Sequence, residues 1–120
     1  MNKMKPNVLK EKSFSFAIEV VKLYKHLAEE KREFVLSKQL LRSGTSVGAM
    51  IREAQNAEST NDFIHKLAIA QKECDETIYW LELIYGSGYL PEEKFKQYFD
   101  EGTEILKILK SVILTTKERR

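Results

Sequence analysis

The fold is decided by one stretch, Gln39-Leu40-Leu41-Arg42-Ser43-Gly44-Thr45-Ser46-Val47-Gly48-Ala49-Met50-Ile51-Arg52-Glu53-Ala54. At 100° per residue, one side of this stretch collects the i, i+4, i+7 pattern of an amphipathic helix, namely Leu40, Gly44, Val47, Ile51 and Ala54. Each glycine disfavours a helix by about 0.8–1 kcal/mol relative to alanine. We therefore interpret Gly44, Gly48 and Ala54 as small residues that permit the close approach of neighbouring helices.

The opposite side of the same helix is basic. It carries a second row at spacings of four, three, four and three residues, made of Lys38, Arg42, Thr45, Ala49 and Arg52. Lys66 and Lys72 of the following helix are available to extend it. Positive charges with hydroxyls between them can follow a phosphate backbone, so these five cations are the candidate nucleic-acid contacts. Charge alone favours an ordinary solvated face, but oligomerisation would repeat the row and concentrate its field.

Four segments of the chain have helical periodicity, and no segment alternates as a strand does. Residues 1–12 are polar and basic and are expected to form a flexible arm, and the first helix is expected to begin near Ser13, a good N-cap residue. The second helix should run from about Phe34 or Ser37 to about Asn56.

The last two helices have clear start and stop signals. Ser59 can cap the third helix, with Asp62 beside its positive end, and glycine ends it at Gly86. Pro91 opens the fourth helix. The sequence predicts an all-α protein, an antiparallel up-down-up-down four-helix bundle over residues 13–116, followed by a basic tail over 117–120.

Composition narrows the class of protein. At 120 residues, with 42% hydrophobic and 32% charged residues, the chain should form one globular domain. A single cysteine excludes an internal disulfide framework and agrees with the cytoplasm. No apolar run has the length of a signal-peptide core or a membrane span, so we expect a cytoplasmic protein.

The residues that would carry catalysis do not converge in the sequence. His26 and His65 lie on different helices, and only Asp62, three residues before His65, could pair with a histidine on a metal. The predicted core face of the third helix is made of Phe63, Leu67, Ala70, Cys74, Ile78, Leu81 and Tyr85. Both Asp62 and His65 lie off this face, at positions where exposed polar residues are ordinary. Cys74 lies on the core stripe, where a cysteine is usually an inert hydrophobe. We expect no enzyme, no metal and no cofactor.

Apolar residues also lie outside the predicted core seams. A second apolar surface on a small protein usually marks an interface, and we expect self-association through Phe14, Ile18, Ile69, Trp80 and Ile84. The alternative is a wide core in which the first and third helices are the most buried members.

Several runs of residues together resemble a known family. The matching runs are Leu40–Ala54, Asp62–Leu67, Lys72–Thr77 and Tyr79–Leu81. They are similar to the four-helix-bundle proteins encoded in 23S rRNA intervening sequences, and to accessory proteins of diversity-generating retroelements. One departure is Met50, where the family commonly has Asn.

The resemblance implies a small non-enzymatic bundle that assembles as a ring, typically a homopentamer, with a basic surface suited to RNA or DNA. In the retroelement relatives, the ring associates with a reverse transcriptase and its RNA. Two hypotheses follow for this chain. The first is a homo-oligomer that binds nucleic acid through its basic face. The second is a protein-interaction scaffold, such as a partner of a reverse transcriptase, without direct nucleic-acid binding.

Overall fold

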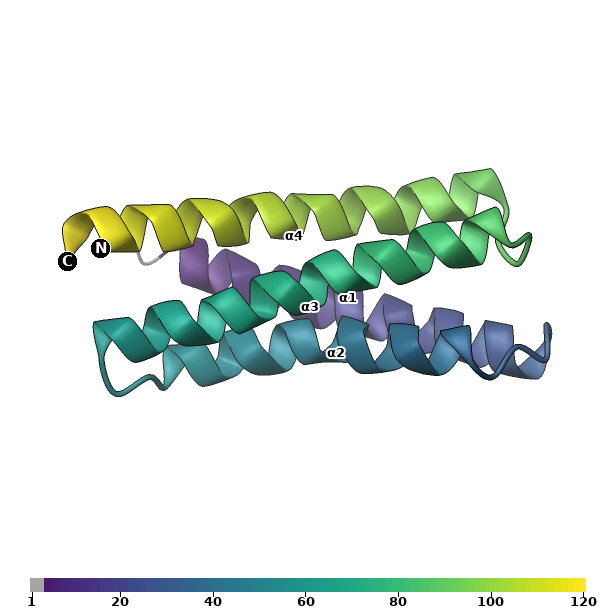
Figure 1. Ribbon diagram of the computed structural model, residues 1–120, viewed down its shortest axis with the longest axis horizontal. Coiled ribbons are helices and arrows are strands. Elements are labelled where there is room, and N and C mark those ends of the chain that lie inside the picture. The colour runs from purple at the N-terminus through teal and green to yellow at the C-terminus, as the bar shows by residue number, and fades with distance from the viewer. Residues whose placement is uncertain (1–3) are drawn as a thin grey trace.

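The computed structural model describes residues 4–120, and over this range the chain folds into four helices. They are α1 (Met4–Glu29), α2 (Leu36–Gln55), α3 (Thr60–Gly86) and α4 (Glu92–Arg119). The short connections alternate between the two ends of the bundle, so consecutive helices run in opposite directions (Figure 1). The result is a rod of 47 × 22 × 19 Å. Within the described range, no helix is both long and apolar enough to cross a membrane.

The helices pack in a cycle, α1 on α2, α2 on α3, α3 on α4 and α4 on α1. The predicted stripe of α2 is confirmed, because all five of its residues are buried. On α3, five of the seven predicted core residues are buried, and Phe63 and Tyr85 are only partly covered. Apolar spacing along α2, and at most positions along α3, therefore predicts which residues form the core.

The start of α1 differs from the prediction. A flexible arm over residues 1–12 is wrong for residues 4–12, which are helical, whereas residues 1–3 lie outside the described range. Leu9, 1% exposed, extends the buried stripe upstream, and Pro6 falls in the first turn, where its missing N–H costs little. Ser13 is also 1% exposed, and lies under Gly48 instead of capping a helix.

The end of α4 also differs from the prediction. The basic tail expected over residues 117–120 is helical as far as Arg119. Val112 and Ile113 are buried, and the Thr116 hydroxyl donates to the Val112 carbonyl at 2.7 Å. The Arg120 Nη1 donates to Asn61 Oδ1 at 2.8 Å, which ties this end of α4 to the start of α3.

Three helix ends behave as their sequences predict. Ser59 caps α3 by accepting a hydrogen bond from the Asp62 N–H at 3.0 Å. The α3 helix ends at Gly86, and Gly88 takes a left-handed conformation with φ of +86° in the turn that follows. Pro91 is the N-cap of α4, and its carbonyl accepts from the Phe95 N–H at 3.0 Å.

Candidate nucleic-acid interface and assembly surfaces

The α2 helix exposes the predicted basic row. Its buried stripe faces α1 and α3, so Lys38, Arg42 and Arg52 on the other side are exposed to solvent. Thr45, between them, is half-buried, and its hydroxyl donates to the Leu41 carbonyl at 2.7 Å. The helical wheel therefore predicted the exposure of these three cations correctly.

Arg42 is bound by two carboxylates of α3. Its Nη1 lies 3.1 Å from Glu73 Oε1, and its Nη2 pairs with Glu76 Oε2. The same Glu76 oxygen accepts a hydrogen bond from Trp80 Nε1 at 3.3 Å. Partly exposed ion pairs contribute only about 0–1 kcal/mol to stability. They nevertheless place two negative charges where a phosphate would have to approach Arg42.

Of the other four candidate cations, one is paired with a carboxylate and three are not. Lys66 Nζ lies 3.2 Å from Glu53 Oε1, which links α3 to α2. In the part of the chain that the structure describes, Lys38, Arg52 and Lys72 have no carboxylate partner, and all three are exposed. The structure therefore leaves these three side chains available to an external anion.

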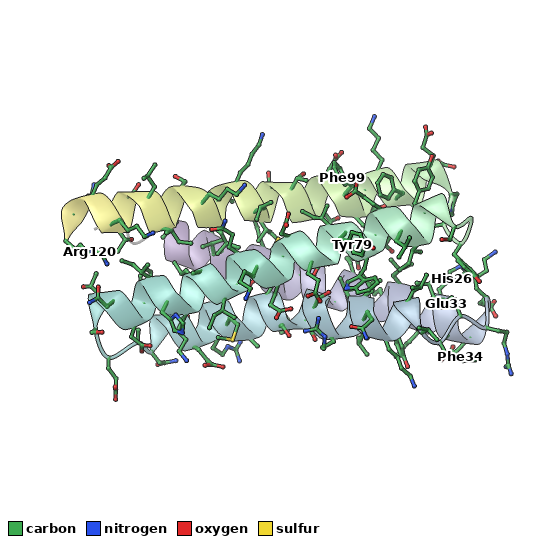
Figure 2. The ribbon with its side chains drawn as sticks, in the orientation of Figure 1. His26, Glu33, Phe34, Tyr79, Phe99 and Arg120 are labelled. Atoms are coloured by element: carbon green, nitrogen blue, oxygen red, sulfur yellow. The ribbon has the colours of Figure 1, made fainter. Side chains whose placement is uncertain are left out.

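The residues considered for catalysis lie apart and have structural surroundings. His26 and His65 are exposed, and Asp62 accepts a hydrogen bond from the Glu58 N–H at 3.2 Å. Over residues 4–120, no group of three or more histidine, cysteine or acidic side chains could hold a metal ion. Figure 2 shows His26 beside Glu33 and Phe34 at one end of the rod, far from Arg120.

Cys74 is a buried thiol with a structural role. Its S–H donates to the Gly102 carbonyl of α4 at 3.3 Å. Burial, with a smaller contribution from the charge of Asp75, raises the pKa of the thiol to about 12. At neutral pH the sulfur is therefore protonated and unreactive.

The predicted interface residues have three different environments. Phe14 and Ile18 are 59% and 42% exposed on α1, whereas Ile69 and Trp80 of α3 are half-buried. Trp80 packs against the core. The assignment of Ile84 is corrected, because it is fully buried within the single chain and cannot reach a second one.

Tyr79 is an exposed aromatic residue to which the sequence analysis gave no role. It is 55% exposed on α3 and meets the ring of Trp80 edge-on, with the centroids 5.1 Å apart. A signal was present in the sequence. Asp75 and Glu82, four residues before and three after Tyr79, place it on a polar face of the helix.

A partly open groove of about 380 Å³ lies between α1 and α2. Phe14 and Ala17 line it from α1, and Thr45, Gly48 and Ala49 from α2. Small side chains on α2 leave the hollow unfilled, so a large part of the Phe14 ring faces solvent. The remaining lining residues are polar or charged, namely Lys10, Ser13, Arg52 and Glu53.

The chain matches a known protein family over most of its length. The model for the 23S rRNA-intervening sequence protein matches residues 5–111. The chain belongs to this family. A solved structure from Bacteroides thetaiotaomicron, described as a protein of unknown function from the S23 ribosomal protein family, is 54% identical. The match covers 91% of this chain and 97% of that one, with a TM-score of 0.90. The comparison with curated proteins gives no match.

Met50 is the position at which the chain departs from the family resemblance. The side chain is half-buried on α2 and packs against the hydrophobic core. An apolar contact therefore stands at the position where the resemblance implies a polar Asn.

Proposed function

We propose that this member of the 23S rRNA-intervening sequence family is a non-enzymatic homo-oligomer that binds RNA or DNA through exposed cations. One observation carries the proposal: Lys38, Arg52 and Lys72 are exposed on neighbouring helices, and no carboxylate in the described chain neutralises them. Lysine and arginine side chains in this state attract phosphates and release condensed counterions on binding. The ring typical of the family, a homopentamer, would repeat these charges and strengthen the field.

The five candidate contacts are not equivalent. Arg42 would have to exchange Glu73 and Glu76 for phosphate, and Lys66 would have to leave Glu53. Such an exchange replaces one ionic contact with another and yields little net attraction. Lys38, Arg52 and Lys72 therefore carry most of the affinity in this proposal.

A salt titration tests the proposal with a matched pair of double variants. Lys38→Ala with Arg52→Ala should lower the slope of log K against log salt by about 1.4–1.8, because each phosphate contact contributes about 0.7–0.9. The control is Lys96→Ala with Lys107→Ala, which removes the same charge from exposed positions of α4. Fluorescence anisotropy of a labelled RNA and a DNA of the same sequence gives K at each salt concentration.

Two results would contradict the nucleic-acid proposal. One is no binding of either oligonucleotide at low salt. The other is an equal loss of slope in the α2 and α4 double variants, which would mean that net charge alone governs the interaction. In either case, Lys38 and Arg52 would serve only to keep the protein soluble.

A second candidate function is that of a protein-interaction scaffold. The exposed apolar side chains Phe14, Ile18 and Tyr79 favour it, because exposed apolar side chains of this size can anchor a protein partner. A reverse transcriptase is one such partner, by the resemblance to retroelement accessory proteins. Retained self-assembly in the absence of nucleic-acid binding would favour this function over the first.

A further inference from the structure

The groove between α1 and α2 has the features of a docking surface. Phe14, 59% exposed, lines it from α1, and the small residues Gly48 and Ala49 line it from α2. Its volume of about 380 Å³ lies at the lower end of the ~300–1,000 Å³ typical of ligand pockets. The hollow therefore suits one or two side chains of a partner. We call it the groove surface.

The groove surface carries uncompensated positive charge. Lys10 and Arg52 are exposed residues of its lining, and neither has an ion-pair partner among the described residues. Glu53 is the single acidic residue of the lining, and Lys66 from α3 already neutralises it. An occupant of this groove should therefore combine an apolar group with negative charge.

The same chain presents such a group on another helix. Tyr79 of α3 is 55% exposed, and the exposed carboxylates Asp75 and Glu82 lie one helical turn to either side of it. Neither carboxylate has an ion-pair partner within residues 4–120. We call these three residues the Tyr79 surface. Figure 2 shows Tyr79 on α3 and Phe99 on α4 at similar positions along the long axis of the rod.

We propose that the Tyr79 surface of one copy docks into the groove surface of a second copy. The aromatic ring fills the hollow beside Phe14, and the two carboxylates lie near Lys10 and Arg52. The charges of the two surfaces are complementary in sign. Lys10 and Arg52 of the groove surface, and the two carboxylates of the Tyr79 surface, have no ion-pair partner among the described residues. The proposal rests on the self-association in the proposed function, and it names the two surfaces that meet.

The symmetry of the contact follows from the position of the two surfaces. The groove surface lies on α1 and α2, and the Tyr79 surface lies on α3. A contact between two different surfaces is heterologous, so an open chain of copies keeps one free groove at one end and one free tyrosine at the other until a ring closes. A self-complementary dimer, in which the same surface meets itself, would need neither a free groove nor a free tyrosine.

Mixing two assembly-deficient variants tests this arrangement. Ala49→Trp fills the groove but keeps Tyr79, and Tyr79→Ala removes the ring but keeps the groove. Each variant alone should be a monomer, because loss of a central aromatic anchor weakens association about tenfold or more. Their equimolar mixture should form one dimer, joined by the intact groove of one and the intact tyrosine of the other. Sedimentation equilibrium measures the masses.

The controls separate folding from docking. Both substituted side chains are exposed, so circular dichroism should show wild-type helix content and a cooperative melt in each variant. Phe34→Ala removes an aromatic side chain of similar exposure, 47%, from the connection between α1 and α2 and should leave the wild-type mass unchanged.

Charge reversal provides a second arm that avoids the candidate nucleic-acid contacts. Lys10→Glu should weaken assembly about tenfold, and adding Asp75→Lys in the same chain should recover most of the loss. Lys10 is used here because Arg52 belongs both to the groove surface and to the candidate nucleic-acid contacts. The wild-type oligomer is measured in parallel without nucleic acid.

The outcomes distinguish the failure of this inference from that of the proposed function. A monomeric wild-type protein would contradict both the docking and the self-association. An oligomer that tolerates Ala49→Trp and Tyr79→Ala would overturn the docking alone, as would a mixture that stays monomeric. Loss of RNA binding in Ala49→Trp with unchanged mass would show that the groove serves nucleic acid instead, and would also overturn the docking.

Discussion

Gly44 sets the distance between α1 and α2. A Cβ added there would lie 2.7 Å and 2.9 Å from the two methyl carbons of Val20, which is closer than side chains tolerate. At Gly48, the same addition would lie 3.5 Å from Ser13, an ordinary contact. The two glycines look alike in the sequence, but only Gly44 is required by packing. Gly48 instead lines the groove surface.

This difference predicts opposite effects of the same substitution. Gly44→Ala should lower the free energy of unfolding by about 1–3 kcal/mol, because overpacking a buried helix contact forces the neighbours apart. Gly48→Ala should leave stability unchanged or raise it by up to about 1 kcal/mol, because alanine favours the helix. Urea denaturation of both variants checks the prediction, and equal destabilisation would contradict it.

At the scale of the element, Glu33 organises the start of α2. Its carboxylate accepts hydrogen bonds from the N–H groups of Val35, Leu36 and Ser37, at 3.2, 3.0 and 2.7 Å. Burial alone raises the pKa of Glu33, but these backbone donors and the Ser37 side chain outweigh it, so the net pKa is lowered from 4.5. The charged carboxylate therefore stabilises a helix end whose amides have no carbonyl partners.

The lowered pKa of Glu33 predicts a dependence of stability on pH. The stabilisation should be fully present above pH 4.5 and lost as the pH falls through the lower pKa of the folded state. Glu33→Gln should destabilise the protein by about 1–2 kcal/mol at pH 7, as loss of a helix cap does, and by progressively less as the pH falls below 4.5. Glu29→Gln, an exposed position at the end of α1, is the control, and urea denaturation over a series of pH values from 7 downward is the measurement.

The elements also show what could be predicted from the sequence. The buried stripe of α2 was predictable because burial follows from spacing along one helix. The start of α1 was not, because Ser13 looks like a cap until Gly48 of another helix is placed over it. The ion pairs of Arg42 were also unpredictable, since Glu73 and Glu76 lie more than 30 residues away along the chain. Recognising that Ile84 is buried needed the rotation of α3 within the bundle.

At the scale of the whole molecule, the protein is a rod of 47 × 22 × 19 Å whose long sides are formed by the helices. Tyr79 and Trp80 are adjacent on one such side but differ in burial. Tyr79→Ala should reduce the mass of the oligomer with little effect on thermal stability. Trp80→Ala should lower the free energy of unfolding by about 1–3 kcal/mol, because part of the indole packs on the core. Sedimentation and thermal melts on both variants check this, and the reverse pattern would contradict it.

The composition of α2 has a consequence for the order of folding. A 20-residue helix with two glycines, three serines and one threonine has little tendency to form alone in water. Its stability comes from neighbours on both sides, through Gly44 against Val20 of α1 and the Ser43 hydroxyl against Thr77 of α3 at 3.0 Å. Nucleation should therefore begin in the other helices, and α2 should become helical only as it docks between α1 and α3, which makes its formation cooperative with the whole bundle.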